Sequence, residues 1–127
     1  MKLAGAFNIT DGLYPNIQKF IRAGVPVAIA SDCSPVSYNS NMLFAIYLAV
    51  RYCHMTIEGA LNAATVNAAY SLGILDTAGS IEPGKRADII ILSVDDYRKI
   101  PYQYGSRLVD TVINNGEIVM RNGAMVL

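Results

Sequence analysis

The sequence predicts an α/β protein in which helices and one buried strand come before a set of short strands. Between residues 14 and 72, apolar side chains mostly recur every three or four positions, which is the spacing of helices that bury one face. Residues 25–30 interrupt this spacing with an apolar run, VPVAIA, which is typical of a strand covered on both faces. After Gly79 the spacing shortens, and Asn-Gly pairs separate the apolar runs, which favours antiparallel hairpins.

Composition indicates one globular domain whose partner is a small molecule or another protein. The 127 residues are 53% hydrophobic, and ten basic residues balance ten acidic ones without a run of either sign. This balance gives no electrostatic footprint for nucleic acid or an anionic membrane. No apolar stretch approaches the roughly 20 residues of a spanning helix, and the first residues lack the apolar core of a secretory leader. The two cysteines form neither a disulfide framework nor a structural zinc pattern, so the predicted location is the cytoplasm.

The first predicted helix begins near Pro15 and ends before Gly24, with the usual asymmetry of proline at the start and glycine after the end. Its apolar face carries Leu13, Ile17, Phe20 and Ile21. The strand at residues 25–30 follows directly. A complete eight-fold barrel needs about 250 residues, so the chain has room for only one or two such αβ units.

Two further helices are predicted before the strands. The first spans about residues 40–54 and is apolar around most of its circumference, which implies burial against more than one neighbour. The second begins after Thr56 as N-cap and runs to Leu72, with Gly73 at its end. Small side chains on one face would let this helix approach its support closely: Ala60, Ala64 and Ala68.

The last third of the chain predicts turns and strands. Pro83-Gly84 marks a turn, residues 88–92 form a strand, and residues 95–104 form a polar, aromatic connector. Asn115-Gly116 and Asn122-Gly123 separate three apolar runs and accept the positive φ of two-residue hairpin turns. A three-stranded meander is therefore expected from residue 108 onward.

Asp32 is the candidate for chemistry, because it follows the predicted buried strand. Chemistry in α/β folds gathers at the carboxyl ends of strands, where a carboxylate can bind a metal or move a proton. Asp followed by Ser and Pro is also good turn chemistry. From the residues alone, both readings of Asp32 stay open.

Four segments resemble a known family. Residues 64–69 (ATVNAA) and 79–92 (GSIEPGKRADIIIL) resemble the carboxy-terminal stretch of metal-dependent amidohydrolases, and residues 30–37 (ASDCSPVS) and 100–105 (IPYQYG) resemble the imidazolonepropionases among them. The resemblance implies that residues 1–75 form the last αβα elements of a (β/α)8 barrel. Residues 76–127 would then form part of a small β-sandwich that ends in the meander.

The same resemblance implies a site. Asp32 corresponds to the family's metal-binding aspartate at the end of the eighth barrel strand, with zinc or iron as the cofactor. There, water is activated to attack the ring carbonyl of imidazolone-5-propanoate, which gives N-formimidoyl-L-glutamate in histidine degradation. Ser34, Val36 and Ser37 would lie against the substrate, although Ser34 replaces a family asparagine and Val36 a family glycine.

The chain lacks other ligands of such a site. It has no His-x-His pair, and its one histidine, His54, lies in a helical region unlike any ligand position of the family. Because a catalytic zinc takes three protein ligands, we expect the chain alone to be inactive and to be a carboxy-terminal fragment. Its open strand edges predict a homo-oligomer or association with a complementary fragment. The alternatives are a related aminoarene deaminase or cyclic amidase, and a non-catalytic remnant that acts as an interaction module.

The remaining reactive side chains have structural explanations that we favour. Cys33 is expected to be a small buried side chain rather than a thiolate ligand, and Cys53-His54 a helix end rather than a metal site. Lys85 and Arg86 resemble phosphate binders in isolation, but beside Pro83-Gly84 they predict a solvated hairpin tip that pairs with Asp88.

A last group of side chains is expected to join elements. Tyr97, Tyr102 and Tyr104 could stack on a ring substrate but are better explained as cover for the join between barrel and sandwich. Thr65 and Asn67 are expected to satisfy backbone groups around the third helix.

Overall fold

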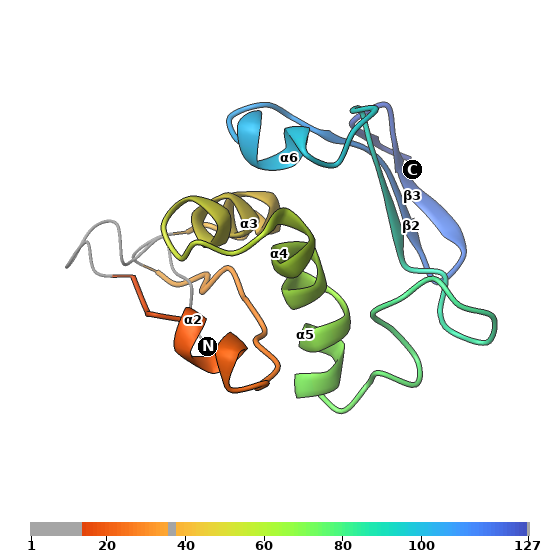
Figure 1. The fold of residues 1–127 in the computed structure, drawn as a ribbon. Helices are drawn as coiled ribbons and strands as arrows, with labels where there is room; N and C mark the ends of the chain where they lie inside the picture. The colour runs from red at the N-terminus through yellow and green to blue at the C-terminus, as the bar shows by residue number, and fades with distance from the viewer. Residues whose placement is uncertain (1–13, 36–37, 127) are drawn as a thin grey trace.

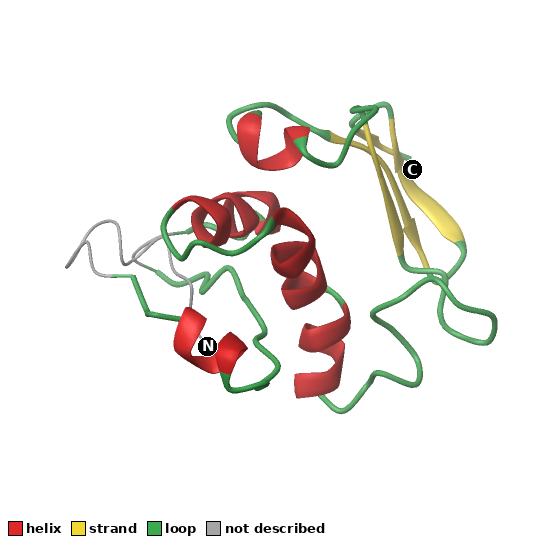
Figure 2. Cartoon of the chain, viewed as in Figure 1, coloured by secondary structure: helices red, strands yellow, loops and turns green. Residues whose placement is uncertain are grey.

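A computed structural model describes residues 14–35 and 38–126, and it places helices in one part and a four-stranded sheet in another (Figure 1). Figure 2 shows that helices and strands are almost completely segregated along the chain, with one short helix inserted between two strands. The elements are α2 (Gln18–Arg22), α3 (Met42–Arg51), α4 (Ile57–Ala64), α5 (Val66–Ser71), β1 (Ile89–Leu92), α6 (Lys99–Tyr102), β2 (Val109–Asn114), β3 (Glu117–Arg121) and β4 (Ala124–Met125). Among these residues, no helix is long and apolar enough to cross a membrane.

The predicted first helix is present as α2, but it is shorter than expected. Ile17 at its start is fully buried, whereas Phe20 and Ile21 remain about half exposed. Gly24 has φ +71° and donates its N–H to the Ile21 carbonyl at 3.0 Å, which ends the helix.

Residues 25–30 differ from the prediction, because they do not form a strand. A strand needs a hydrogen-bonded neighbour, and within the described residues none lies beside this segment. The coverage is also one-sided. Val27 and Ile29 are 7% and 3% exposed, whereas Pro26 and Ala30 on either side of them are exposed and Ala28 between them is half-buried. The segment therefore buries one face only.

Helix α3 confirms the second predicted helix. Its N-cap is Asn41, whose Oδ1 accepts the backbone N–H groups of Leu43 and Phe44 at 3.0 and 3.3 Å. The helix packs against both α4 and α6, which agrees with its nearly all-round apolar pattern. Its buried side chains are Ala45, Ile46, Leu48 and Ala49.

The third predicted helix begins as expected and is then interrupted. Thr56 caps α4 by accepting the Gly59 N–H at 3.0 Å. At Thr65, whose φ and ψ of −123° and −88° are not helical, the helix breaks into α4 and α5, and the Thr65 hydroxyl donates to the Leu61 carbonyl at 2.8 Å. In a continuous helix that carbonyl would accept the Thr65 N–H, which instead donates to the Asn62 carbonyl at 3.3 Å.

The structure also corrects the predicted alanine face. Ala60 is fully buried as expected, but Ala64 and Ala68 are only partly buried. Ala63 and Ala69 take the buried places instead. Ala63 lies three residues after Ala60 within α4, so this part of the face differs from the prediction before the break is reached. The interruption at residue 65 can account only for the change from Ala68 to Ala69 in α5.

The sheet is antiparallel with the order β1-β2-β3-β4, and the predicted meander is confirmed in β2, β3 and β4. Asn115 and Gly116 both have positive φ, as do Asn122 and Gly123, which is the type I′ conformation expected of these pairs. The first of these turns is also tied to the start of β1. The Asn115 N–H donates to Asp88 Oδ1 at 2.8 Å, and the Gly116 N–H donates to the Ala87 carbonyl at 3.0 Å.

The connector between β1 and β2 contains a short helix that was not predicted. In α6, Ile100 is 2% exposed and joins the core against α3. Asp96 Oδ1 accepts the Arg98 N–H at 2.9 Å just before the helix, and Asp95 forms an ion pair with Lys99. The polar character of residues 95–104 concealed Ile100, the aliphatic side chain that joins them to the core.

Candidate functional site

Asp32 lies two residues after the one-sided apolar segment and is half-buried. Its φ is +52°, a left-handed conformation that is uncommon outside glycine but tolerated by aspartate. Residues 31–34 form no regular turn, and the left-handed backbone at Asp32 is compatible with either a structural role or a functional carboxylate. Both readings of Asp32 therefore stay open.

Two hydrogen bonds hold the segment that leads to Asp32. The Ile29 N–H donates to the Ala63 carbonyl at 3.1 Å, and Asn67 Nδ2 donates to the Val27 carbonyl at 2.9 Å. Both partners flank the break between α4 and α5. Sequence reasoning identified Asn67 as a backbone-satisfying residue, but its acceptor, 40 residues away, has no signal in the sequence.

The loop after Asp32 is described only in part. Ser34 is half-buried, and its carbonyl accepts the Tyr38 N–H at 2.8 Å. Tyr38 is exposed and has φ +48°. Val36 and Ser37, which sequence reasoning placed against a substrate, lie outside the described residues.

The donors in the described part of the chain do not form a metal site by themselves. Among residues 14–35 and 38–126, no three His, Cys, Asp or Glu side chains come together. Asp32 can contribute one carboxylate, whereas a catalytic zinc takes three protein ligands. Any metal centre that uses Asp32 would therefore need ligands from other residues.

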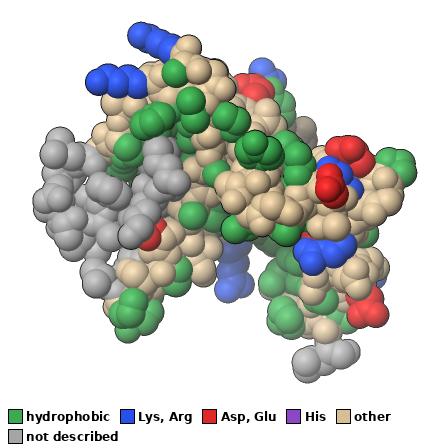
Figure 3. Space-filling view, turned by 90° about the horizontal axis from the view of Figure 1, so that it is seen from below, with side chains coloured by type: hydrophobic (Ala, Val, Ile, Leu, Met, Phe, Trp, Pro, Cys, Tyr) green, Lys and Arg blue, Asp and Glu red, His purple; other side chains and the backbone are tan. Residues whose placement is uncertain are grey.

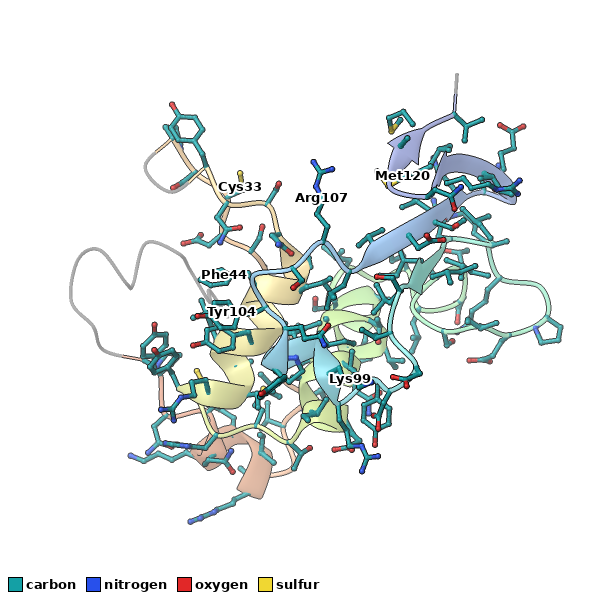
Figure 4. All side chains as sticks on the ribbon, turned by 90° about the horizontal axis from the view of Figure 1, so that it is seen from above. Cys33, Phe44, Lys99, Tyr104, Arg107 and Met120 are labelled. Carbon is teal, nitrogen blue, oxygen red and sulfur yellow. The ribbon has the colours of Figure 1, made fainter. Side chains whose placement is uncertain are left out.

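The two cysteines differ from each other in their surroundings. Cys33 is exposed on the loop after Asp32, so the prediction of a small buried side chain is wrong (Figure 4). Its neighbours on the loop are polar or exposed, and no apolar element of the described chain covers it. Cys53 is buried, and this burial raises the pKa of its thiol. A buried neutral thiol beside the exposed His54 does not make a ligand pair.

Two of the three connector tyrosines join the connector to the helices. Tyr97 donates its hydroxyl to Glu58 Oε1 at 2.6 Å, in the first turn of α4. Tyr104 stacks on Tyr47 of α3 with ring centroids 4.0 Å apart and lies beside Phe44 (Figure 4). Tyr102 differs, since it is 84% exposed. The joining role is present in the first two, and Tyr102 takes no part in it.

The predicted solvated hairpin tip is present only in part: Arg86 is exposed beside the Pro83-Gly84 turn, but the Lys85 side chain is only 12% exposed, and no strand of the described residues precedes the turn. Arg86 forms an ion pair with Asp88, and Lys85 Nζ donates to Ser80 Oγ at 2.7 Å and lies 3.3 Å from Glu82 Oε1. These contacts are local and occupy both cations, which argues against a phosphate site at this tip.

Comparison with known proteins adds to this geometry. A sequence model of the amidohydrolase family matches residues 11–119. The chain is 58% identical to an imidazolonepropionase from Picrophilus torridus over 117 residues, which are 92% of this chain and 29% of that protein.

Solved structures agree with the match. An amidohydrolase from Thermotoga maritima MSB8 is 33% identical and superimposes with a TM-score of 0.67 over 84% of this chain and 26% of its own. An atrazine chlorohydrolase from Arthrobacter aurescens TC1, complexed with zinc, has the same fold with a TM-score of 0.80 at 24% identity, over 99% of this chain and 32% of its own. The chain thus spans less than a third of the length of each protein.

Proposed function

This chain belongs to the amidohydrolase family, and from that premise we propose that it is the carboxy-terminal part of an imidazolonepropionase. The observation that carries the proposal is the 58% identity to the Picrophilus torridus enzyme across 92% of the chain. The proposed substrate is imidazolone-5-propanoate, a cyclic amide of histidine degradation. Residues 1–75 would belong to the (β/α)8 barrel and residues 76–127 to the β-sandwich.

The reaction adds one water to the ring. The water oxygen bonds to the ring carbonyl carbon, the bond from that carbon to the ring nitrogen breaks, and the nitrogen gains a proton, which gives N-formimidoyl-L-glutamate. We propose that Asp32 transfers the proton: its carboxylate accepts the proton from the water and delivers it to the leaving nitrogen. Ser34, Val36 and Ser37 are proposed to contact the substrate from the loop that follows.

We further propose that the complete enzyme needs a metal ion, zinc or iron, with Asp32 as one ligand and the others outside the described residues. Such an ion supplies a more acidic water at neutral pH. The zinc in the atrazine chlorohydrolase of the same fold supports a metal in general.

If the chain is the carboxy-terminal part of a barrel enzyme, its expected partner is the rest of that barrel. Exposed apolar side chains beside residues 25–28 favour association with the complementary part of the barrel, or with a second copy when that part is absent. A cytoplasmic location remains our proposal, and the two free cysteines are consistent with it.

A segment exchange tests the function. The 117-residue stretch of the Picrophilus torridus enzyme that aligns with this chain is replaced by this chain, and the hybrid is assayed on imidazolone-5-propanoate. We expect the hybrid to be active, and Asp32→Asn to lower its kcat by at least about 100-fold because the carboxylate can no longer take the proton.

Asp76→Asn is the matched control, because Asp76 is exposed in the turn after α5, and it should leave kcat unchanged. Guanine and cytosine serve as competing substrates. Turnover of either in preference to imidazolone-5-propanoate would favour the deaminase alternative, and full activity of Asp32→Asn would contradict the role of Asp32.

A further inference from the structure

The segment that leads to Asp32, residues 25–30, is hydrogen-bonded along one edge to a helix junction instead of a strand. Residues 25–30 have no strand beside them within the described chain, yet the Val27 carbonyl and the Ile29 N–H are both hydrogen-bonded. In an extended chain these two groups point to the same side. They are the pair that one residue of a parallel neighbouring strand, opposite Ala28, would bond.

The break at Thr65 creates this helix junction. Carbonyls in the last turn of a helix lack an intrahelical N–H partner, and because α4 ends at Ala64, the Ala63 carbonyl is one of them. It accepts the Ile29 N–H at 3.1 Å. Two residues past the break, Asn67 supplies an amide N–H to the Val27 carbonyl at 2.9 Å. The helix junction thus offers one acceptor and one donor to the same edge of the segment.

Burial and the two hydrogen bonds fix different aspects of how the segment lies. Val27 and Ile29 point their side chains into the core, and Ile29 packs in the same cluster as Ala60 and Ala63. The side chains fix which face is inward, but apolar contacts are non-directional and allow sliding along the segment. The two hydrogen bonds prevent this sliding, and the second of them is made by Ile29, three residues before Asp32.

We propose that Asn67 is a positioning residue for Asp32: together with the Ala63 carbonyl, its amide takes the place of a neighbouring strand and fixes the backbone from which Asp32 projects. The inference rests on the proposed function where it gives Asp32 a catalytic role. Catalytic geometry has to be held within about 0.5 Å, and a misplacement of about 1 Å can cost about 100-fold in rate. A hydrogen bond with this reach therefore matters to the rate even though Asn67 does not touch the substrate.

The first test uses the 127-residue chain and does not depend on activity. In Asn67→Ala, we expect amide hydrogen exchange at Ile29 to accelerate by about tenfold, and the NMR shifts of Asp32 to move, because the segment loses one of its two anchors. Asn67→Asp, which keeps the size but loses the N–H donor, should behave alike and serves if the alanine variant does not fold.

Asn62→Ala is the matched control. Asn62 is an exposed asparagine of α4 whose side chain makes no hydrogen bond within the described part of the chain. This variant should leave the Ile29 exchange rate and the Asp32 shifts unchanged.

The second test uses the hybrid enzyme. Asn67→Ala and Asn67→Asp should lower kcat by about 10- to 100-fold with little change in KM, because the proton-transferring group is displaced while substrate contacts remain. A purely structural role would lower the yield of folded enzyme without this split between kcat and KM.

The outcomes separate the two proposals. Unchanged exchange at Ile29 in both Asn67 variants would overturn the anchor, and faster exchange with unaltered kcat would overturn the positioning role. If the hybrid with the unaltered chain were inactive, the proposed function would fail, while the Asp32 shifts in the isolated chain would still decide whether Asn67 positions that residue.

Discussion

At Gly79 the loop before β1 passes against the start of α5 so closely that only a residue without Cβ fits. A Cβ built there would lie 2.6 Å from Ala69 Cβ, 3.2 Å from the Thr65 carbonyl oxygen and 3.3 Å from Val66 Cα. Its φ of +98° is also unfavourable for any other residue. Two independent penalties therefore act on any side chain at this position.

We predict that Gly79→Ala lowers the free energy of unfolding by about 2 kcal/mol or more, measured by urea denaturation. Gly73→Ala, at φ +70° with open space around it, isolates the backbone penalty and should cost about 1 kcal/mol. Gly105→Ala meets neither penalty and should change nothing. Equal unfolding midpoints for Gly79→Ala and Gly73→Ala would show that the close approach to α5 adds nothing to the free-energy cost of the substitution.

Among the elements, the connector between β1 and β2 is joined to α4 by a hydrogen bond between two side chains. The Tyr97 hydroxyl donates to Glu58, and this hydrogen bond is the main reason why the pKa of Glu58 is lowered and that of Tyr97 is raised. A lowered carboxyl pKa stabilises the fold above the unfolded-state pKa, and this stabilisation is lost as pH falls through the folded-state pKa. For Tyr97 the stabilisation is present below its unfolded-state pKa and is lost as pH rises through its raised pKa.

Tyr97→Phe should return the pKa of Glu58 towards its ordinary value, followed by NMR titration of the Glu58 carboxyl carbon. It should also weaken the dependence of unfolding on pH in the acid range. Tyr102→Phe is the control, because Tyr102 is almost fully exposed and should leave Glu58 unaffected. An unchanged Glu58 titration in Tyr97→Phe would contradict the link.

Elements that depend on local chemistry could be predicted, and those that depend on a distant partner could not. The N-cap at Thr56 and the turn at Asn115-Gly116 depend on the residues that form them, and both are present. Residues 25–30 read as a strand because their apolar pattern says nothing about whether a neighbour is there to pair with. The break at Thr65 lies inside a run whose apolar spacing continues on both sides of it, so periodicity does not encode it.

The same limit applies to the site. Asp32 could be singled out from its place after an apolar run, but the hydrogen bond between Asn67 and Val27 spans 40 residues, and no local pattern encodes it. The exposure of Cys33 was missed because residue type gives only an average burial.

The molecule as a whole exposes apolar side chains on its surface. Figure 3 shows hydrophobic side chains in several separate groups on the face seen from below. One hollow is lined by a set that we call the apolar edge, in which Phe20 is 50% and Val25 is 48% exposed: Phe20, Val25, Pro26 and Ala28. An edge of this kind beside an unpaired segment is expected to bind a complementary surface.

We predict that this chain binds a Picrophilus torridus imidazolonepropionase from which the aligned stretch has been removed, as measured by light scattering after gel filtration. Phe20→Asp should weaken this binding by at least about tenfold, because a charge would be buried in an apolar contact. Ile81→Asp is the matched control, since Ile81 is 82% exposed but lies outside the apolar edge. Equal binding by both variants would place the contact elsewhere.

The hydrogen bonds that join the Asn115-Gly116 turn to Ala87 and Asp88 have a consequence for chain length. They set the alignment of β1 at the end of the sheet farthest from the connector, so the connector does not have to act as a ruler. Extra residues spliced in at Gly105, where the surroundings are open, should loop outward without sliding β1 along β2. This part of the chain can therefore carry a tag or a reporter peptide while the isoleucines of β1 keep their places.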